Sequence, residues 1–178
     1  MKKTLKLYLA LAAVAAMSMP AFAQEPANPL SAGQKALYSI VNDALVRGAE
    51  KMPEENYSFK PTPEVRSFGQ LVGHVADAQY LFCSMALGEK NPMPRIEKTK
   101  TSKADLVQAL KDGVAYCNKA YDGMTDAQAS QIVKLFGRDS AKLTVLSLNT
   151  AHSDEHYGNM VTYLRLKGIV PPTSEKRK

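Results

Sequence analysis

Residues 143–168, LTVLSLNTAHSDEHYGNMVTYLRLKG, are the stretch of sequence that decides the fold. Apolar residues recur in it at helical spacing, which predicts the last and longest helix of the chain. Gly168, with Pro171 and Pro172 behind it, predicts where this helix ends. The apolar positions that set the period are Leu143, Leu146, Ala151, Met160, Tyr163 and Leu164.

Three further helices are predicted upstream, each by a start signal and an apolar stripe. In the first, Asn28 can cap, Pro29 occupies the first turn, and the helix reaches about Met52. The second starts at Ser67, where Gln70 can complete a capping box. The stripes are expected to face the core and comprise Leu30, Leu37, Ile40, Val41, Ala44 and Leu45, then Phe68, Leu71, Val75, Ala78, Phe82 and Met85.

A third helix is predicted from Ser102 to just before Gly123, after a crossing loop at 91–101 that contains Pro92 and Pro94. Thr125 with Gln128 then caps a short helical piece through about Leu135. No stretch alternates with period two for long enough to indicate a sheet. The sequence therefore predicts an all-α protein, an antiparallel four-helix bundle with one extra short helix.

The N-terminal residues have the pattern of an export signal. Lys2, Lys3 and Lys6 precede an apolar run over 7–19, and Ala21-Phe22-Ala23 supplies a small-x-small cleavage pattern. We expect a signal peptide over 1–23, cleavage near Ala23, a single helical domain over 24–172 and a basic tail over 173–178. The predicted location is periplasmic or secreted, without stable membrane insertion after cleavage.

Charge argues against nucleic-acid binding. The formal net charge is +6, from 23 basic and 17 acidic residues. Removal of the three leader lysines leaves 20 basic residues against 17 acidic ones, or about +3. No dense basic stripe with interleaved aromatics occurs, so no nucleic-acid partner is expected.

The chain has only three histidines, and their positions are informative. His152 and His156 are four residues apart, so they point the same way from one helix. His74 shares a helical face with Leu71 and Ala78 and should look into the bundle. Facing helices can thus bring three imidazoles together as metal ligands with an open coordination position. Histidines with a purely structural role are the alternative that spacing alone leaves open.

Three segments together resemble the DinB-like family, which includes the YfiT-like proteins. They are Gly73-His-Val-Ala-Asp77, His152-Ser-Asp-Glu-His156-Tyr-Gly-Asn-Met, and Tyr163-Leu-Arg-Leu-Lys-Gly168-Ile-Val-Pro-Pro. The resemblance spans about residues 30–172. It implies a four-helix bundle that holds a divalent metal through one histidine of the second helix and two of the last.

The resemblance also implies a class of chemistry. Some relatives are thiol transferases that use bacillithiol, mycothiol or glutathione, and a metal-coordinated thiol is deprotonated at neutral pH. Those thiols are mainly cytoplasmic, whereas the leader predicts export. Two hypotheses therefore remain. The protein is a metal-dependent thiol transferase-like enzyme, or it is a noncatalytic metal- or ligand-binding stress module.

A hydrolase is a third alternative, because residues 152–156 match the His-x-x-Glu-His pattern of some zinc peptidases. Glu155 would then act as base for metal-bound water, although a solvated helix charge is the simpler role. Asp77, one turn after His74, could orient a ligand histidine or could be an ordinary flank charge. Tyr157, Asn159 and Tyr163 are expected near the pocket without a catalytic role.

Three imidazoles suit several divalent ions. We expect zinc or nickel, with iron, manganese and copper as alternatives. A small-molecule substrate fits such a site, and a homodimer is compatible with the sequence. Cys83 and Cys117 lie on successive predicted helices of an exported chain, so we hypothesise a disulfide, with two buried thiols as the alternative.

Overall fold

The computed structural model describes residues 27–176. The predicted signal peptide and its cleavage point lie outside this range, as do the last two residues of the predicted tail. The described chain is mostly helical, as predicted. Its elements are α2 (Pro29–Lys51), η1 (Glu54–Asn56), α3 (Phe68–Leu87), α4 (Ile96–Thr99), α5 (Lys103–Tyr121), α6 (Asp126–Ala129), β1 (Ile132–Leu135), β2 (Arg138–Ala141), α7 (Lys142–Leu166) and η2 (Pro172–Ser174).

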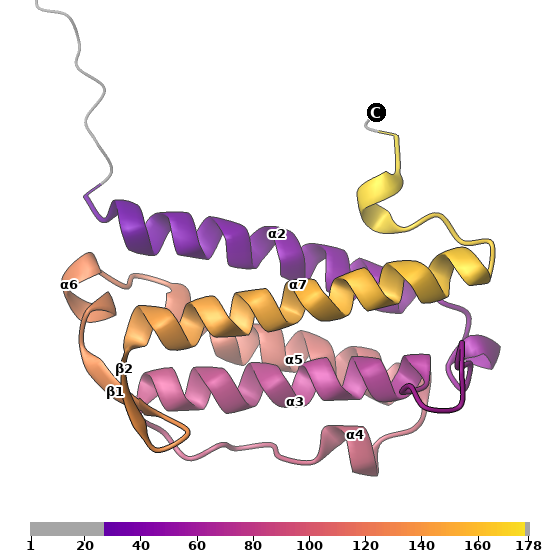
Figure 1. Ribbon diagram of the computed structural model, residues 1–178, viewed down its shortest axis with the longest axis horizontal. Helices are drawn as coiled ribbons and strands as arrows, with labels where there is room; N and C mark the ends of the chain where they lie inside the picture. The colour runs from indigo at the N-terminus through magenta and orange to yellow at the C-terminus, as the bar shows by residue number, and fades with distance from the viewer. Residues whose placement is uncertain (1–26, 177–178) are drawn as a thin grey trace, which may run out of the picture.

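The four long helices α2, α3, α5 and α7 lie side by side (Figure 1). Helix α3 packs against α5 and α7, and α2 packs against α7 and α5. Two of these pairs are parallel. In the first pair, Gln34 of α2 bonds to Thr150 of α7, and the later residue Gly48 of α2 faces the later residue Met160 of α7, so both helices run the same way. Likewise α3 and α5 run the same way, from the Gly69–Leu106 contact to the Cys83–Cys117 link. The predicted antiparallel order is therefore wrong for these two pairs.

The connection over 88–102 explains the parallel pair. A 19-residue helix such as α5 is about 28 Å long, whereas 15 extended residues can reach roughly 50 Å. Pro92 and Pro94 disfavour helix in this connection, which allows it to return along the outside of the bundle (Figure 1). It carries the one-turn helix α4, where the sequence predicts only a loop.

Several predicted helix ends are confirmed. Ser67 with Gln70, and Thr125 with Gln128, both form reciprocal capping boxes. Ser102 caps α5 by accepting the amide of Asp105. Local side-chain chemistry thus sets these boundaries as the sequence indicates.

The predicted stripe of α2 is partly wrong. Leu30, Leu37 and Ile40 are exposed, at 63%, 58% and 65% of their surface, whereas Tyr38 and Asn42 are buried. The buried face of α2 includes polar residues because they bond to partners on other helices. Gln79 of α3, for example, donates to the Asn42 side chain at 3.0 Å.

A β-hairpin replaces part of the predicted short helix. Helix α6 ends at Ala129, and β1 then pairs antiparallel with β2 from the Ile132–Ala141 pair to the Leu135–Arg138 pair. The two loop residues, Phe136 and Gly137, have φ of 49° and 82°. Two left-handed residues give the turn type that matches the twist of paired strands.

The disulfide hypothesis is confirmed, since Cys83 and Cys117 are bonded with their Cα atoms 5.2 Å apart. This bond joins α3 to α5 in the buried core. Among residues 27–176, no helix combines the length and apolar character that crossing a membrane requires.

Candidate metal centre

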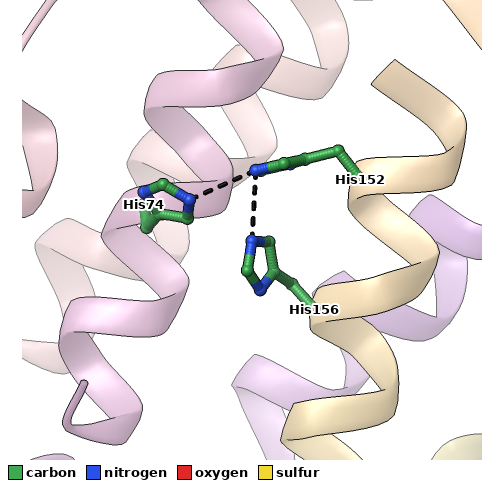
Figure 2. Close-up of side chains that lie close together, drawn as sticks. All are labelled: His74, His152 and His156. Atoms are coloured by element: carbon green, nitrogen blue, oxygen red, sulfur yellow. Dashed lines mark hydrogen bonds between the residues drawn. The ribbon is translucent and has the colours of Figure 1, made fainter. Parts of the chain in front are cut away.

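The three histidines converge as the sequence predicts. His74 comes from α3, and His152 and His156 come from consecutive turns of α7 (Figure 2). The Nε2 atom of His152 lies 3.2 Å from Nε2 of His74 and 3.1 Å from Nε2 of His156. One nitrogen from each of the three rings lies within 4.8 Å of the corresponding nitrogens of the other two. These are the ligand atoms that a metal ion between α3 and α7 would use.

The outer nitrogen of His74 is held by a carboxylate. Nδ1 of His74 donates to Oε2 of Glu97 at 3.1 Å, and Glu97 Oε1 accepts from Nε of Arg66 at 2.9 Å. A proton on Nδ1 leaves the lone pair on Nε2, which is the ligand form of imidazole. Neither Glu97 nor Arg66 is predicted as a site residue from sequence, because Glu97 lies in the predicted loop at 91–101 and Arg66 precedes the predicted helix start at Ser67.

Asp77 lies beside the site but contacts it through the backbone of α4. Its two carboxylate oxygens accept the amides of Ile96 and Glu97 at 2.8 and 2.9 Å. Gly73 allows α4 to come this close, since a Cβ there would lie 2.8 Å from the Glu97 Cα atom. Gly73 and Asp77 together place Glu97 against His74.

Burial favours neutral imidazoles on α7. Burial, followed by repulsion from His156 and His74, lowers the pKa of His152 to about 4. Burial, and then the electrostatic effect of the neighbouring His74, lower the pKa of His156. Both rings are therefore neutral at pH 7, the state in which histidine binds metals.

The second nitrogens of the α7 histidines differ in their surroundings. The side-chain amide of Asn159 lies 3.3 Å from Nδ1 of His156. Nδ1 of His152 is buried and has no hydrogen-bond partner among residues 27–176. The ring orientation of His152 is thus set by packing, including an edge contact to Phe82 with centroids 5.7 Å apart.

The residues present fit a divalent cation. With Nδ1–H of His74 bonded to Glu97, its Nε2 atom carries a lone pair 3.2 Å from Nε2 of His152, and a cation would be coordinated by both nitrogens. Three imidazoles, with no fourth protein ligand grouped with them in residues 27–176, are the donor set of an open catalytic zinc site. His74, His152 and His156 would hold the ion.

A cavity of about 740 Å³ reaches His156 from the side of the predicted base. Glu155 is exposed and lines this cavity with Arg66, Glu97, Asn159 and Tyr163. The hydroxyl of Tyr163 donates to the carbonyl of Arg66 at 2.7 Å, and Tyr157 bonds to Thr173 instead.

Comparison with known proteins identifies the family. The model of the DinB superfamily matches residues 38–160, about two thirds of the chain. This chain belongs to the DinB superfamily. Within it, the chain is 28% identical over 123 residues to the uncharacterized protein YjoA of Bacillus subtilis strain 168, covering 67% of this chain and 79% of YjoA.

Solved structures share the DinB-like fold. A DinB-like protein from Bacillus cereus ATCC 10987 superposes with a TM-score of 0.70 at 18% identity, over 79% of this chain and 94% of that one. The YjoA structure gives 0.62 at 25% identity, over 85% and 100% of the two chains. A mutant of mycothiol-dependent maleylpyruvate isomerase gives 0.62 at 15% identity, over 80% of this chain and 63% of that one. At these identities the first and last show a common fold alone.

Proposed function

We propose that this DinB-superfamily protein binds one divalent metal ion through Nε2 of His74, His152 and His156 and catalyses a metal-dependent transfer reaction on a thiol. The observation that carries the proposal is the convergence of one nitrogen from each ring within 4.8 Å. A cation at this point would deprotonate a coordinated thiol and so supply a thiolate nucleophile at neutral pH.

The protein's own residues would prepare the site. Glu97 holds the proton on Nδ1 of His74 and orients the ring, and Arg66 holds the second oxygen of Glu97. The cavity beside His156 gives a reactant access to the cluster. Four-residue helix α4 keeps Glu97 in place without adding a fourth ligand.

Export is part of the proposal. The leader pattern of residues 1–23 supports it, and so does the Cys83–Cys117 disulfide, since disulfides persist mainly in oxidising compartments. Mass determination of the protein from the periplasmic fraction tests this point. A start at Gln24 is expected, and an intact leader on protein confined to the cytoplasm would contradict export.

Two other functions compete. In a noncatalytic binding module the metal would be structural, with no exchangeable position. Hydrolysis is favoured by one observation, that Glu155 lines the same cavity as His156 and could serve as a base there.

Elemental analysis tests the metal site first. The mature protein, purified without an affinity His tag, should carry about one divalent ion per chain, and His152→Ala should lose it. Asp154→Ala is the matched control, because Asp154 is exposed on the same helix two residues away. Absence of metal from the parent after incubation with zinc or nickel would overturn the proposal.

Cobalt(II) substitution then separates the candidate functions. Dithiothreitol added to the cobalt protein should produce a thiolate-to-cobalt charge-transfer band if a thiol can reach an open position. An unchanged spectrum would favour the binding module. Glu155→Gln should leave this band intact while abolishing any ester hydrolysis, which distinguishes the hydrolase from the transferase.

A further inference from the structure

A second cavity reaches the histidines from the hairpin end of the bundle. Its volume is about 210 Å³, below the roughly 300–1,000 Å³ of pockets for drug-sized ligands. The cavity beside His156 extends along α7 toward Tyr163, whereas this one extends along α3 toward Phe82. Its lining includes His74 and His152 at the histidine cluster and, further from the cluster, the apolar residues Ala78, Leu81, Phe82 and Pro94.

The walls of this second cavity are mostly apolar. Phe82 packs edge-on against His152 and against Phe136 at the hairpin tip, with centroids 5.7 and 6.1 Å away. Phe136 is 63% exposed, so the hairpin places an aromatic side chain next to the cavity wall. The Asp77 carboxylate also lines the cavity, but both its oxygens accept amides of α4. A compact apolar group is what these walls accommodate.

Arg95 supplies a free positive charge at the same cavity. It is exposed, and its guanidinium makes no ion pair or hydrogen bond within residues 27–176. Its backbone has φ 74° and ψ 28°, a left-handed conformation that is unfavourable for a residue with a side chain. Residues held in this region concentrate at functional sites.

The cavity on the other side of the cluster is more acidic than this one, in which the charges of Asp77 and Arg95 balance. Glu64, Glu97 and Glu155 line it, and its arginine, Arg66, is already paired with Glu97. A negatively charged reactant is therefore better accommodated in the Arg95 cavity, where Arg95 is unpaired among the described residues and the Asp77 oxygens already accept amides, than in the His156 cavity.

We infer that the Arg95 cavity binds the second substrate, a compact molecule with an apolar body and one carboxylate-like negative group. The body contacts Leu81 and Phe82, and the anion pairs with Arg95. This inference rests on the proposed function, in which the thiol approaches from the His156 cavity and the two reactants meet at the histidines.

Benzoate is a suitable probe, with benzamide as its neutral counterpart of the same size. We expect benzoate to bind the EDTA-treated full-length mature protein in calorimetric titration and to shift the NMR signals of Leu81 and Arg95. Because a hydrogen bond to a charged group is stronger than one to a neutral group, benzamide should bind at least about tenfold more weakly. Arg95→Gln should weaken benzoate binding by a similar factor and leave benzamide unchanged.

Two controls separate this cavity from the rest of the surface. Arg165→Gln removes an exposed arginine at the far end of α7 and should leave benzoate binding unchanged. Ala78→Met should fill the cavity and abolish binding of both probes, with circular dichroism and thermal unfolding confirming that the variant is folded.

Three results would overturn the inference: no benzoate binding, unchanged affinity in Arg95→Gln, or shifts confined to Arg66 and Glu155. Use of metal-free protein keeps this test separate from the proposed function. Arg95-dependent binding without any metal in elemental analysis would retain the cavity and reject the metal site. A bound metal without Arg95-dependent benzoate binding would retain the metal site and reject the proposed substrate cavity.

Discussion

Helices α2, α3 and α7 carry two polar clusters that lie next to each other and behave differently. The first is the histidine cluster of His74, His152 and His156. The second, here called the buried amide network, comprises Asn42, Gln79, Asn149 and Ser153, all 2% exposed or less. Gln79 donates to Asn42 and Ser153 at 3.0 and 2.9 Å and accepts from Asn149 at 3.2 Å.

The difference lies in where the polar atoms find partners. In the buried amide network, the polar side-chain atoms form hydrogen bonds with other protein atoms, and only Oδ1 of Asn149 lacks a partner among residues 27–176. In the histidine cluster three ring nitrogens face one another, and two cavities reach them. Because buried polar groups cost free energy unless satisfied, the first arrangement stabilises the fold and the second favours a bound ligand.

The largest expected effect comes from the disulfide beside the buried amide network. Cys83→Ala with Cys117→Ala should lower the free energy of unfolding by about 4 kcal/mol, since the bond closes a loop with a sequence separation of 34. Urea unfolding measures this loss. Metal affinity should change little, because the bonded cysteines are not among the ligands. A large loss of metal binding in folded protein would show that the two clusters are coupled.

Gln79→Ala tests the network directly. Removal of this side chain takes the hydrogen-bond donor from Oδ1 of Asn42 and Oγ of Ser153 and opens a cavity, so stability should fall by about 2–4 kcal/mol. Gln108→Ala is the matched control. Gln108 is exposed on α5 and bonds only to Asp112, so its loss should cost less than about 0.5 kcal/mol. Equal unfolding midpoints for the two variants would contradict the assigned role of the network.

Gly73→Ala should act on the histidine cluster instead. The new Cβ would displace Glu97 from His74, and loss of such an outer partner typically lowers metal affinity 10–100-fold. Glu97→Gln should also lower the metal affinity. Competition with a chelating dye measures the metal affinity of both variants. Gly158→Ala on α7 is the control, since a Cβ there meets nothing within 4 Å. Its metal affinity should match that of the parent.

The smallest effect concerns pH. Burial lowers the pKa of His152 to about 4, whereas an unfolded histidine has a value of about 6.5. Between these values the unfolded chain binds more protons, so the metal-free protein should lose stability as the pH falls through this window. His152→Gln should weaken that dependence, and urea midpoints at several pH values compare the two proteins. Identical pH profiles would argue against a neutral, buried His152.

Much of this comparison could be predicted from sequence. Spacing alone places His152 and His156 on one face, and the capping residues Ser67 and Thr125 mark true helix starts. These features depend on residues within one turn of each other, which is the range over which sequence patterns are reliable.

The rest depends on contacts between distant segments. Asn42 and Gln79 are polar, so periodicity does not assign them to the core, although they satisfy each other there. Glu97 reaches His74 across 23 positions, from a segment with prolines and charges that indicates a loop. In the hairpin, Phe136 takes a left-handed conformation that its side chain does not predict.

The crossover between α3 and α5 has a consequence for how this protein can change. It makes the two helices parallel, and the same segment carries Arg95 and Glu97, one at each side of His74. Core packing restricts what α3 and α7 can tolerate, whereas Arg95 at the solvent-exposed edge of this segment is free to vary. Substitution of Arg95 would alter ligand preference while the histidines, Glu97 and the buried Ile96 stay as they are. Arg95 is therefore the position of this segment at which selectivity can be redesigned.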